Sequence, residues 1–74
     1  MADSVYKVIT LIGTSSESWE KAAAAAVQRA AQTLDDLRVA EVRELDMLLE
    51  EGNVISYRVK VRVSFKYREE AKEE

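Results

Sequence analysis

Carboxylate side chains are the groups in this chain best suited to binding a metal ion. Seven lie between positions 35 and 51: Asp35, Asp36, Glu41, Glu44, Asp46, Glu50 and Glu51. Carboxylate oxygens are ligands that Ca²⁺ and Mg²⁺ prefer. No D-x-D-x-D-G loop is present, so an EF-hand is excluded, and a cation site would be shared between chains at a symmetry axis. Our candidate ligands are Asp46, Glu50 and the separate Glu17, and ordinary surface acids are the alternative.

Basic side chains recur at every second position, with one gap, late in the chain: Arg58, Lys60, Arg62, Lys66 and Arg68. Arginine and lysine bind anions, arginine in a two-pronged geometry. One interpretation is therefore a surface that attracts an anionic ligand. The other is a solvated strand face that pairs with acids on a neighbouring strand, and the acids at 44 and 46 favour this second interpretation.

Several classes of function find no support in the composition. The chain has no Cys and no His, so Cys–His catalysis and His/Cys zinc sites are excluded. No phosphate-cradling glycine loop is present, and we expect the protein not to be an enzyme. A net charge of −3 gives no reason to expect nucleic-acid binding. The longest apolar run has six residues, at 22–27, so we expect no membrane span and a cytoplasmic location.

The first half of the chain predicts a strand followed by a helix. Residues 5–12 are rich in β-branched and aromatic types, which favours a strand that ends at Gly13. Residues 14–17 have the pattern of a capping box, which starts a helix. From there to about Asp35, apolar residues recur at spacings of three and four. Most of this stripe is alanine, so the helix can approach a sheet closely.

The second half predicts two long strands. Residues 55–67 alternate between apolar and polar types, which indicates a strand with one apolar face. Residues 37–50 also predict a strand, but the apolar positions change from even to odd numbers near Arg43. A β-bulge or a strong bend near Arg43 explains this change of phase.

A three-residue hairpin loop at 51–53 is predicted to join these strands. The register then pairs Leu49 with Ile55, Met47 with Tyr57, Leu45 with Val59, Asp46 with Arg58 and Glu44 with Lys60. Apolar residues meet apolar residues and acids meet bases, so the register is self-consistent. Each pair of opposite charges adds roughly 0.2–1 kcal/mol of stability.

Together these elements predict an α+β fold of the β-α-β-β type. One helix packs on a three-stranded antiparallel sheet whose last strand lies in the middle, in a single domain over 1–74 with frayed tails at 1–4 and 69–74. A helix of about 18 residues spans roughly 27 Å, whereas a strand of about 13 residues spans roughly 44 Å. The uncovered end of the hairpin, from 45 to 57, therefore needs a partner chain. Oligomerisation is also the remaining means of stabilising a small domain that has no Cys for disulfides and no Cys or His for a zinc site.

Several segments in this order resemble the dodecin family. These are Tyr6-Lys7-Val8-Ile9, Gly13-Thr14-Ser15, Ala30-Ala31-Gln32-Thr33-Leu34, Ala40-Glu41-Val42, Tyr57-Arg58-Val59-Lys60-Val61 and Val63-Ser64-Phe65. The resemblance covers nearly the whole chain and implies the β-α-β-β fold already derived. It also implies a hollow homododecamer that binds flavins in pairs between tryptophans of neighbouring subunits.

The same resemblance locates a ligand site and shows how this chain departs from the family. The position of the stacking tryptophan is held by Val39, a flavin-contacting glutamine by Arg58, and an aspartate near the flavin by Glu44. Stacking a flat ring on an aromatic side chain contributes about 1–3 kcal/mol, and valine has no ring. The chain is thus similar to the branch that lacks this tryptophan, which is associated with calcium.

We accordingly expect a dodecameric shell that binds or stores a small ligand, with flavin (riboflavin, FMN or FAD) bound weakly or not at all. One alternative is a shell that binds Ca²⁺ or another divalent cation such as Mg²⁺ through interface carboxylates. The other is a structural scaffold or partner-binding module.

Overall fold

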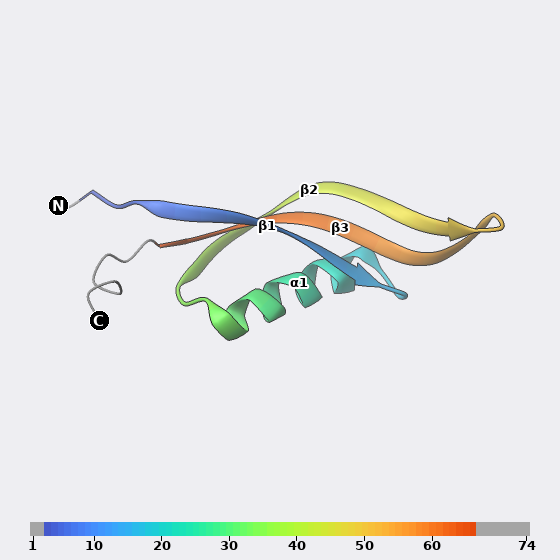
Figure 1. The fold of residues 1–74 in the computed structure, drawn as a ribbon, viewed down its shortest axis with the longest axis horizontal. Helices are drawn as coiled ribbons and strands as arrows, with labels where there is room; N and C mark the ends of the chain where they lie inside the picture. The colour runs from blue at the N-terminus through green and yellow to red at the C-terminus, as the bar shows by residue number, and fades with distance from the viewer. Residues whose placement is uncertain (1–2, 67–74) are drawn as a thin grey trace.

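The computed structural model describes residues 3–66. These form β1 (Tyr6–Ser15), α1 (Trp19–Thr33), β2 (Leu37–Glu50) and β3 (Asn53–Lys66), in that order. Figure 1 shows α1 lying along one face of the three-stranded sheet. The predicted β-α-β-β architecture with an antiparallel sheet is therefore confirmed.

Strand β3 lies in the middle of the sheet, as predicted, in the order β1-β3-β2. It runs antiparallel to both neighbours, so β1 and β2 are parallel to each other. The register between β2 and β3 pairs Glu44 with Lys60 and Asp46 with Arg58, as the sequence predicts. The pairing shifts between Val42 and Glu44, which confirms the bulge.

The predicted start of the helix was wrong. Strand β1 continues through Gly13 to Ser15, and α1 begins only at Trp19. Its cap is Ser18, whose side-chain oxygen accepts a hydrogen bond from the backbone N–H of Lys21 at 3.0 Å. The hydroxyl of Ser15 instead accepts from the backbone N–H of Glu17 at 3.0 Å, which orders the connection between strand and helix.

Gly13 does not end the strand but allows the helix to approach it. A Cβ atom at this position would lie 2.1 Å from the carbonyl oxygen of Ala22 and 3.0 Å from the Cβ of Ala26. Both alanines are buried. The close packing of helix on sheet that the alanine stripe predicts is therefore present. Gly13 is the small residue of the sheet against which the alanines of α1 pack.

The hairpin between β2 and β3 also differs from the prediction. Its turn has two residues, Glu51 and Gly52, with φ values of 52° and 81°, the sign that a type I′ turn requires at both positions. Leu49 consequently pairs with Val54, and its predicted pairing with Ile55 was wrong. A shift between Leu48 and Leu49 restores the predicted register further along the strands. The predicted strand end at Tyr67 and the tail 69–74 lie outside the described residues.

The buried core is small and lies under the helix. It consists of Ala22, Ala26, Ala30, Val59, Val61 and Val63. Trp19 closes one end of it, where its ring meets that of Tyr57 edge-on with centroids 5.0 Å apart. Its indole Nε1 donates a hydrogen bond to the backbone oxygen of Asp46 at 3.1 Å. This confirms that Trp19 has a packing role within the chain.

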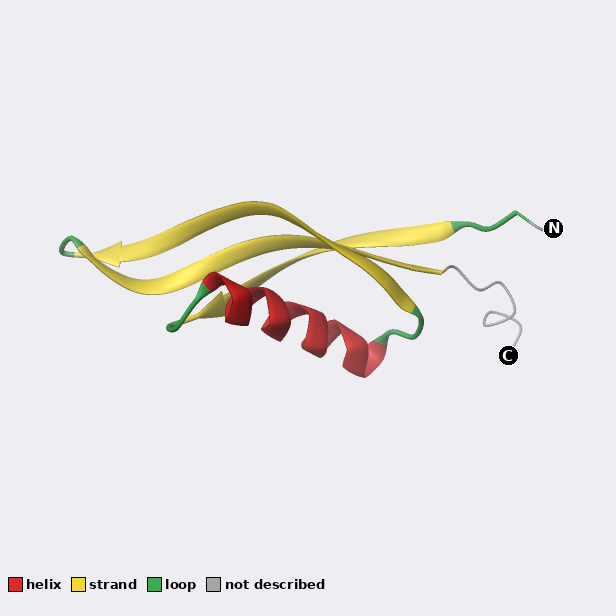
Figure 2. Ribbon diagram, turned by 180° about the vertical axis from the view of Figure 1, so that it is seen from behind, coloured by secondary structure: helices red, strands yellow, loops and turns green. Residues whose placement is uncertain are grey.

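The far half of the β2–β3 hairpin extends beyond the helix as an uncovered arm. Figure 2 shows it projecting past the start of α1. Large apolar side chains are exposed along it: Leu45, Met47, Leu48, Leu49, Val54 and Ile55. The radius of gyration is 15.4 Å, against about 11 Å for a compact domain of this length. Within residues 3–66, no helix is both long enough and apolar enough to cross a membrane.

Candidate functional site

Charged side chains gather on the face of the sheet that points away from α1, here called the outer face. Two ion pairs cross from β2 to β3. Asp46 binds Arg58 through two hydrogen bonds of 2.8 and 3.0 Å, and Glu44 lies 3.3 Å from the Nζ of Lys60. Together with Ile12 these four side chains line a cavity of about 100 Å³. The sequence predicted both pairs.

The Asp46–Arg58 pair is bidentate, with the guanidinium donating to both carboxylate oxygens. The hydrogen bonds from Arg58, assisted by the charges of Arg58 and Lys60, lower the pKa of Asp46 below its ordinary value. The same hydrogen bonds raise the pKa of Arg58. At neutral pH both groups are charged and bound to each other, so neither side chain is free to bind a separate ligand.

The pH dependence of stability should reveal this pair. Because folding lowers the pKa of Asp46, the carboxylate contributes stability above its unfolded-state pKa of about 3.9, and this contribution is lost as the pH falls through the lower folded-state pKa. We expect Asp46→Asn to lower the urea midpoint at pH 7, by a small amount because the pair is solvent-exposed. The difference in urea midpoint between Asp46→Asn and the wild type should disappear as the pH falls below about 3.9.

A suitable control is Asp3→Asn, because Asp3 is exposed and no ion pair joins it to another of residues 3–66. Its urea midpoint should match that of the wild type at both pH values. If Asp46→Asn lowers the urea midpoint by the same amount at pH 7 and pH 2.5, the charge of Asp46 is not the cause of the lost stability.

The three positions carried over from the family share the outer face but not one pocket. Val39 pairs with Ser64, and Glu44 with Lys60, four positions further along β3, which is about 13 Å. Glu44 and Arg58 line the same cavity, whereas Val39 does not. Val39 is 61% exposed. A ligand that touches all three positions would therefore need surfaces from more than one chain.

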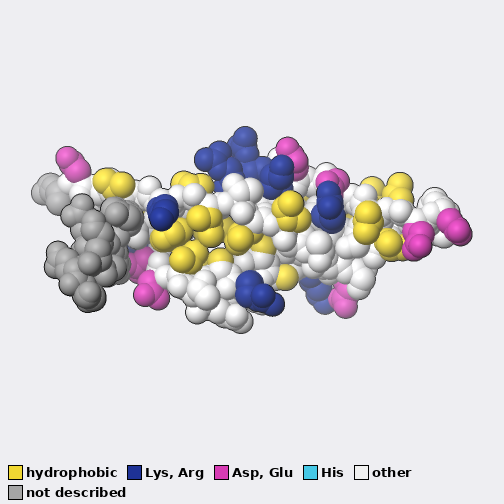
Figure 3. Space-filling view, in the orientation of Figure 1, with side chains coloured by type: hydrophobic (Ala, Val, Ile, Leu, Met, Phe, Trp, Pro, Cys, Tyr) yellow, Lys and Arg dark blue, Asp and Glu magenta, His cyan; other side chains and the backbone are white. Residues whose placement is uncertain are grey.

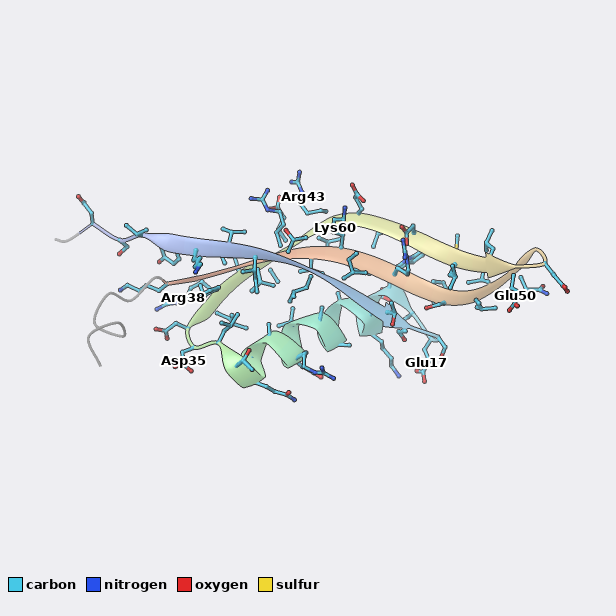
Figure 4. The ribbon with its side chains drawn as sticks, viewed as in Figure 1. Glu17, Asp35, Arg38, Arg43, Glu50 and Lys60 are labelled. Carbon is cyan, nitrogen blue, oxygen red and sulfur yellow. The ribbon has the colours of Figure 1, made fainter. Side chains whose placement is uncertain are left out.

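The three candidate metal ligands do not come together within the chain. Glu17 forms an ion pair with Lys21, and Asp46 is held by Arg58. Figure 4 shows Glu50 near the tip of the hairpin, away from Glu17 beside the start of the helix. In the part of the chain that the structure describes, no three Asp, Glu, His or Cys residues are grouped to hold a metal ion.

One outer-face residue was missed by the sequence analysis. Arg43 sits at the β-bulge, and its guanidinium binds Glu41 at 2.9 Å. Simple alternation along β2 did not place it with the basic residues of β3. The change of phase near position 43 was the available signal, because an extra residue in a strand redirects side chains.

Comparison with known proteins gives consistent matches along the chain. The family model described as Dodecin matches residues 5–68. Calcium dodecin of Mycobacterium tuberculosis is 60% identical over 65 residues, which cover 88% of this chain and 92% of that protein.

Solved structures agree with this result. A crystal structure of the Mycobacterium tuberculosis protein, described as calcium-chelating and as having a novel calcium-binding site, has a TM-score of 0.80 at 59% identity and covers 89% of this chain and 94% of its own. The dodecin of Streptomyces coelicolor has a TM-score of 0.87 at 33% identity and covers 93% and 99%.

Proposed function

The chain belongs to the dodecin family, and from this premise we propose that twelve copies assemble into a closed shell that binds a divalent cation, with Ca²⁺ as the first candidate. The observation that carries the assembly is the uncovered arm. The cation rests on the relationship to calcium dodecin and on the carboxylates of this chain.

The exposed apolar surface of the arm supports assembly. Leu45 is 54% and Leu49 is 57% exposed, and the arm carries apolar side chains on both faces of a two-stranded ribbon. A two-stranded hairpin is at best marginally stable in water without further packing. Burial of apolar area contributes about 25 cal/mol per Å², so neighbouring copies that cover the arm would stabilise it.

The arrangement of the carboxylates supports a cation site built from several chains. Within one chain, Asp46 and Glu17 already have basic partners, and Glu50 stands apart near the hairpin tip. Symmetry-related copies can bring the same carboxylate together from different chains, as the oxygen-rich coordination of Ca²⁺ requires. Glu50 is our first choice because it has no ion-pair partner among residues 3–66.

Two measurements on the purified protein test this proposal. Light scattering should give a particle of about 100 kDa, twelve times the 8.4 kDa chain. Melting with and without Ca²⁺ should then show a shift, because a ligand at 100 times its Kd stabilises the folded state by about 2.7 kcal/mol. Glu50→Gln should reduce the shift, and Mg²⁺ tests selectivity. A single-chain mass would overturn the assembly, and unchanged melting would overturn the cation site.

A weak flavin site is the second candidate, because Glu44 and Arg58 lie together in one outer-face cavity. We expect Val39→Trp to strengthen riboflavin binding about tenfold or more, since an aromatic stack contributes about 1–3 kcal/mol. Quenching of riboflavin fluorescence measures the affinity. Val39→Leu is the control, because it adds apolar volume without a ring. Equal affinities for the two variants would contradict a stacking site at this position.

A further inference from the structure

The arm loses one of its supporting strands at a defined row of residues. Strand β1 pairs with β3 as far as Ser15, whose partner is Tyr57, and Tyr57 pairs on its other side with Met47 of β2. Beyond this row, residues 48–56 form a hairpin of two strands. Figure 3 shows apolar side chains exposed along it, short of the acidic tip. Two-stranded ribbons twist more than wider sheets, so the direction of this hairpin needs a support at its base.

Trp19, the first residue of α1, contacts the sheet at this same row. Its indole Nε1 donates a hydrogen bond of 3.1 Å to the backbone oxygen of Asp46, the neighbour of Met47. Its ring meets that of Tyr57 at an interplanar angle of 69°, the edge-to-face arrangement that aromatic pairs favour. Trp19 therefore holds both strands of the hairpin at the point where β1 ends.

Little else joins α1 to β2. Among residues 3–66, the bond from Trp19 to Asp46 is the one side-chain hydrogen bond between these two elements, and no ion pair links them. Further along the helix, a hollow of about 300 Å³ lies between α1 and β2, with Ala23, Val42 and Leu45 in its lining. The direction of β2 relative to the helix is thus set mainly by the two contacts of Trp19.

We propose that Trp19 is a positioning residue for assembly, which fixes the direction in which the apolar arm leaves the sheet and so presents the arm to neighbouring copies. This inference rests on the proposed assembly. An arm whose direction is already fixed in the single chain loses less conformational freedom when a neighbour covers it, and such preorganisation strengthens association. Trp19 acts through the arm and does not itself need to touch the neighbouring copy.

Dilution of the purified particle, followed by light scattering, tests the effect on assembly. Trp19→Phe keeps a ring beside Tyr57 but loses the N–H group, whereas Trp19→Ala loses both contacts. We expect the Trp19→Phe particle to dissociate at a chain concentration about twofold to tenfold higher than the wild type, the effect of losing one hydrogen bond per chain. The Trp19→Ala particle should dissociate at a higher concentration still.

Hydrogen exchange of backbone amides separates positioning from a general loss of stability. In Trp19→Phe, the amides of residues 48–56 should exchange about twofold to tenfold faster, while those of the β1–β3 pairs near Ile9 keep the wild-type rate. Ala30→Gly is the matched control, because Ala30 is buried near the opposite end of α1 and glycine weakens a helix. It should speed exchange within α1 and leave residues 48–56 unchanged.

The proposal is overturned if residues 48–56 exchange at the same rate in Trp19→Phe and the wild type, or if the two particles dissociate at the same concentration. Equal acceleration of these residues by Ala30→Gly would also overturn it, because any weakening of the helix would then have the same effect. A wild type of single-chain mass would overturn the proposed assembly instead, and the exchange rates would still decide whether Trp19 holds the arm.

Discussion

Replacing Leu49 with Glu and Val54 with Lys together will break the proposed twelve-chain assembly into single chains or small oligomers. The two residues are direct partners near the tip of the arm, and both are exposed in the single chain. The new Glu and Lys face each other across the hairpin, and this pair of opposite charges stabilises the register by roughly 0.2–1 kcal/mol. The net charge of the chain stays at −3. What changes is the apolar surface that we expect neighbouring copies to cover.

Light scattering measures this effect as a fall from about 100 kDa towards the 8.4 kDa of one chain. Burying a charged pair without ideal partners is strongly unfavourable, so we expect essentially complete loss of the large particle at micromolar concentration. The control is Leu49→Val with Val54→Leu, which exchanges the two apolar side chains and should retain the particle. A full-sized particle from the Glu–Lys variant would show that the tip of the arm is not an interface.

Gly13→Ala will destabilise the fold more than Gly52→Ala, which adds the same methyl group in the hairpin turn. The added Cβ would lie 2.1 Å from the backbone oxygen of Ala22. A flexible side chain could move aside, but this atom belongs to the helix backbone, so α1 must shift away from the sheet. Overpacking in a core costs about 1–3 kcal/mol and occasionally more, and we expect about 3 kcal/mol or more here.

Urea unfolding at a fixed chain concentration measures this loss, since the stability of an oligomer depends on concentration. Gly52→Ala is the matched comparison. Its Cβ would meet nothing within 4 Å, but its φ of 81° disfavours alanine, so we expect a loss of about 1 kcal/mol. If the two variants lose equal stability, close packing of α1 on β1 is not what requires Gly13.

The sequence predicted the type and order of the elements, but not all of their boundaries. Residues 14–17 satisfied the capping-box pattern, yet Ser18 is the cap, because Thr14 and Ser15 pair with β3 and so remain in β1. Likewise, Asn53 was expected in the loop, but a two-residue turn with Glu51 in the left-handed region replaced it. Local patterns of this kind carry no information about which neighbour the chain will meet.

The sequence likewise predicted only part of the candidate site. The cross-strand pairs Glu44–Lys60 and Asp46–Arg58 followed from the alternation of residues, because side chains opposite each other in antiparallel strands lie on the same face. The hollow of the outer face that is lined by Thr10, Arg43, Lys60 and Arg62 did not follow from it. Arg43 joins Lys60 and Arg62 only because the bulge redirects it, and Thr10 comes from a strand fifty residues before Lys60.

By itself, then, the sequence determined the β-α-β-β order, the bulge near Arg43, and the exposed apolar arm, since periodicity and composition act over a few residues. Tertiary structure alone decided how closely α1 approaches Gly13 and which charges share a hollow on the outer face. Those features depend on distances between segments remote in the chain, and such distances are set by packing rather than by any local pattern.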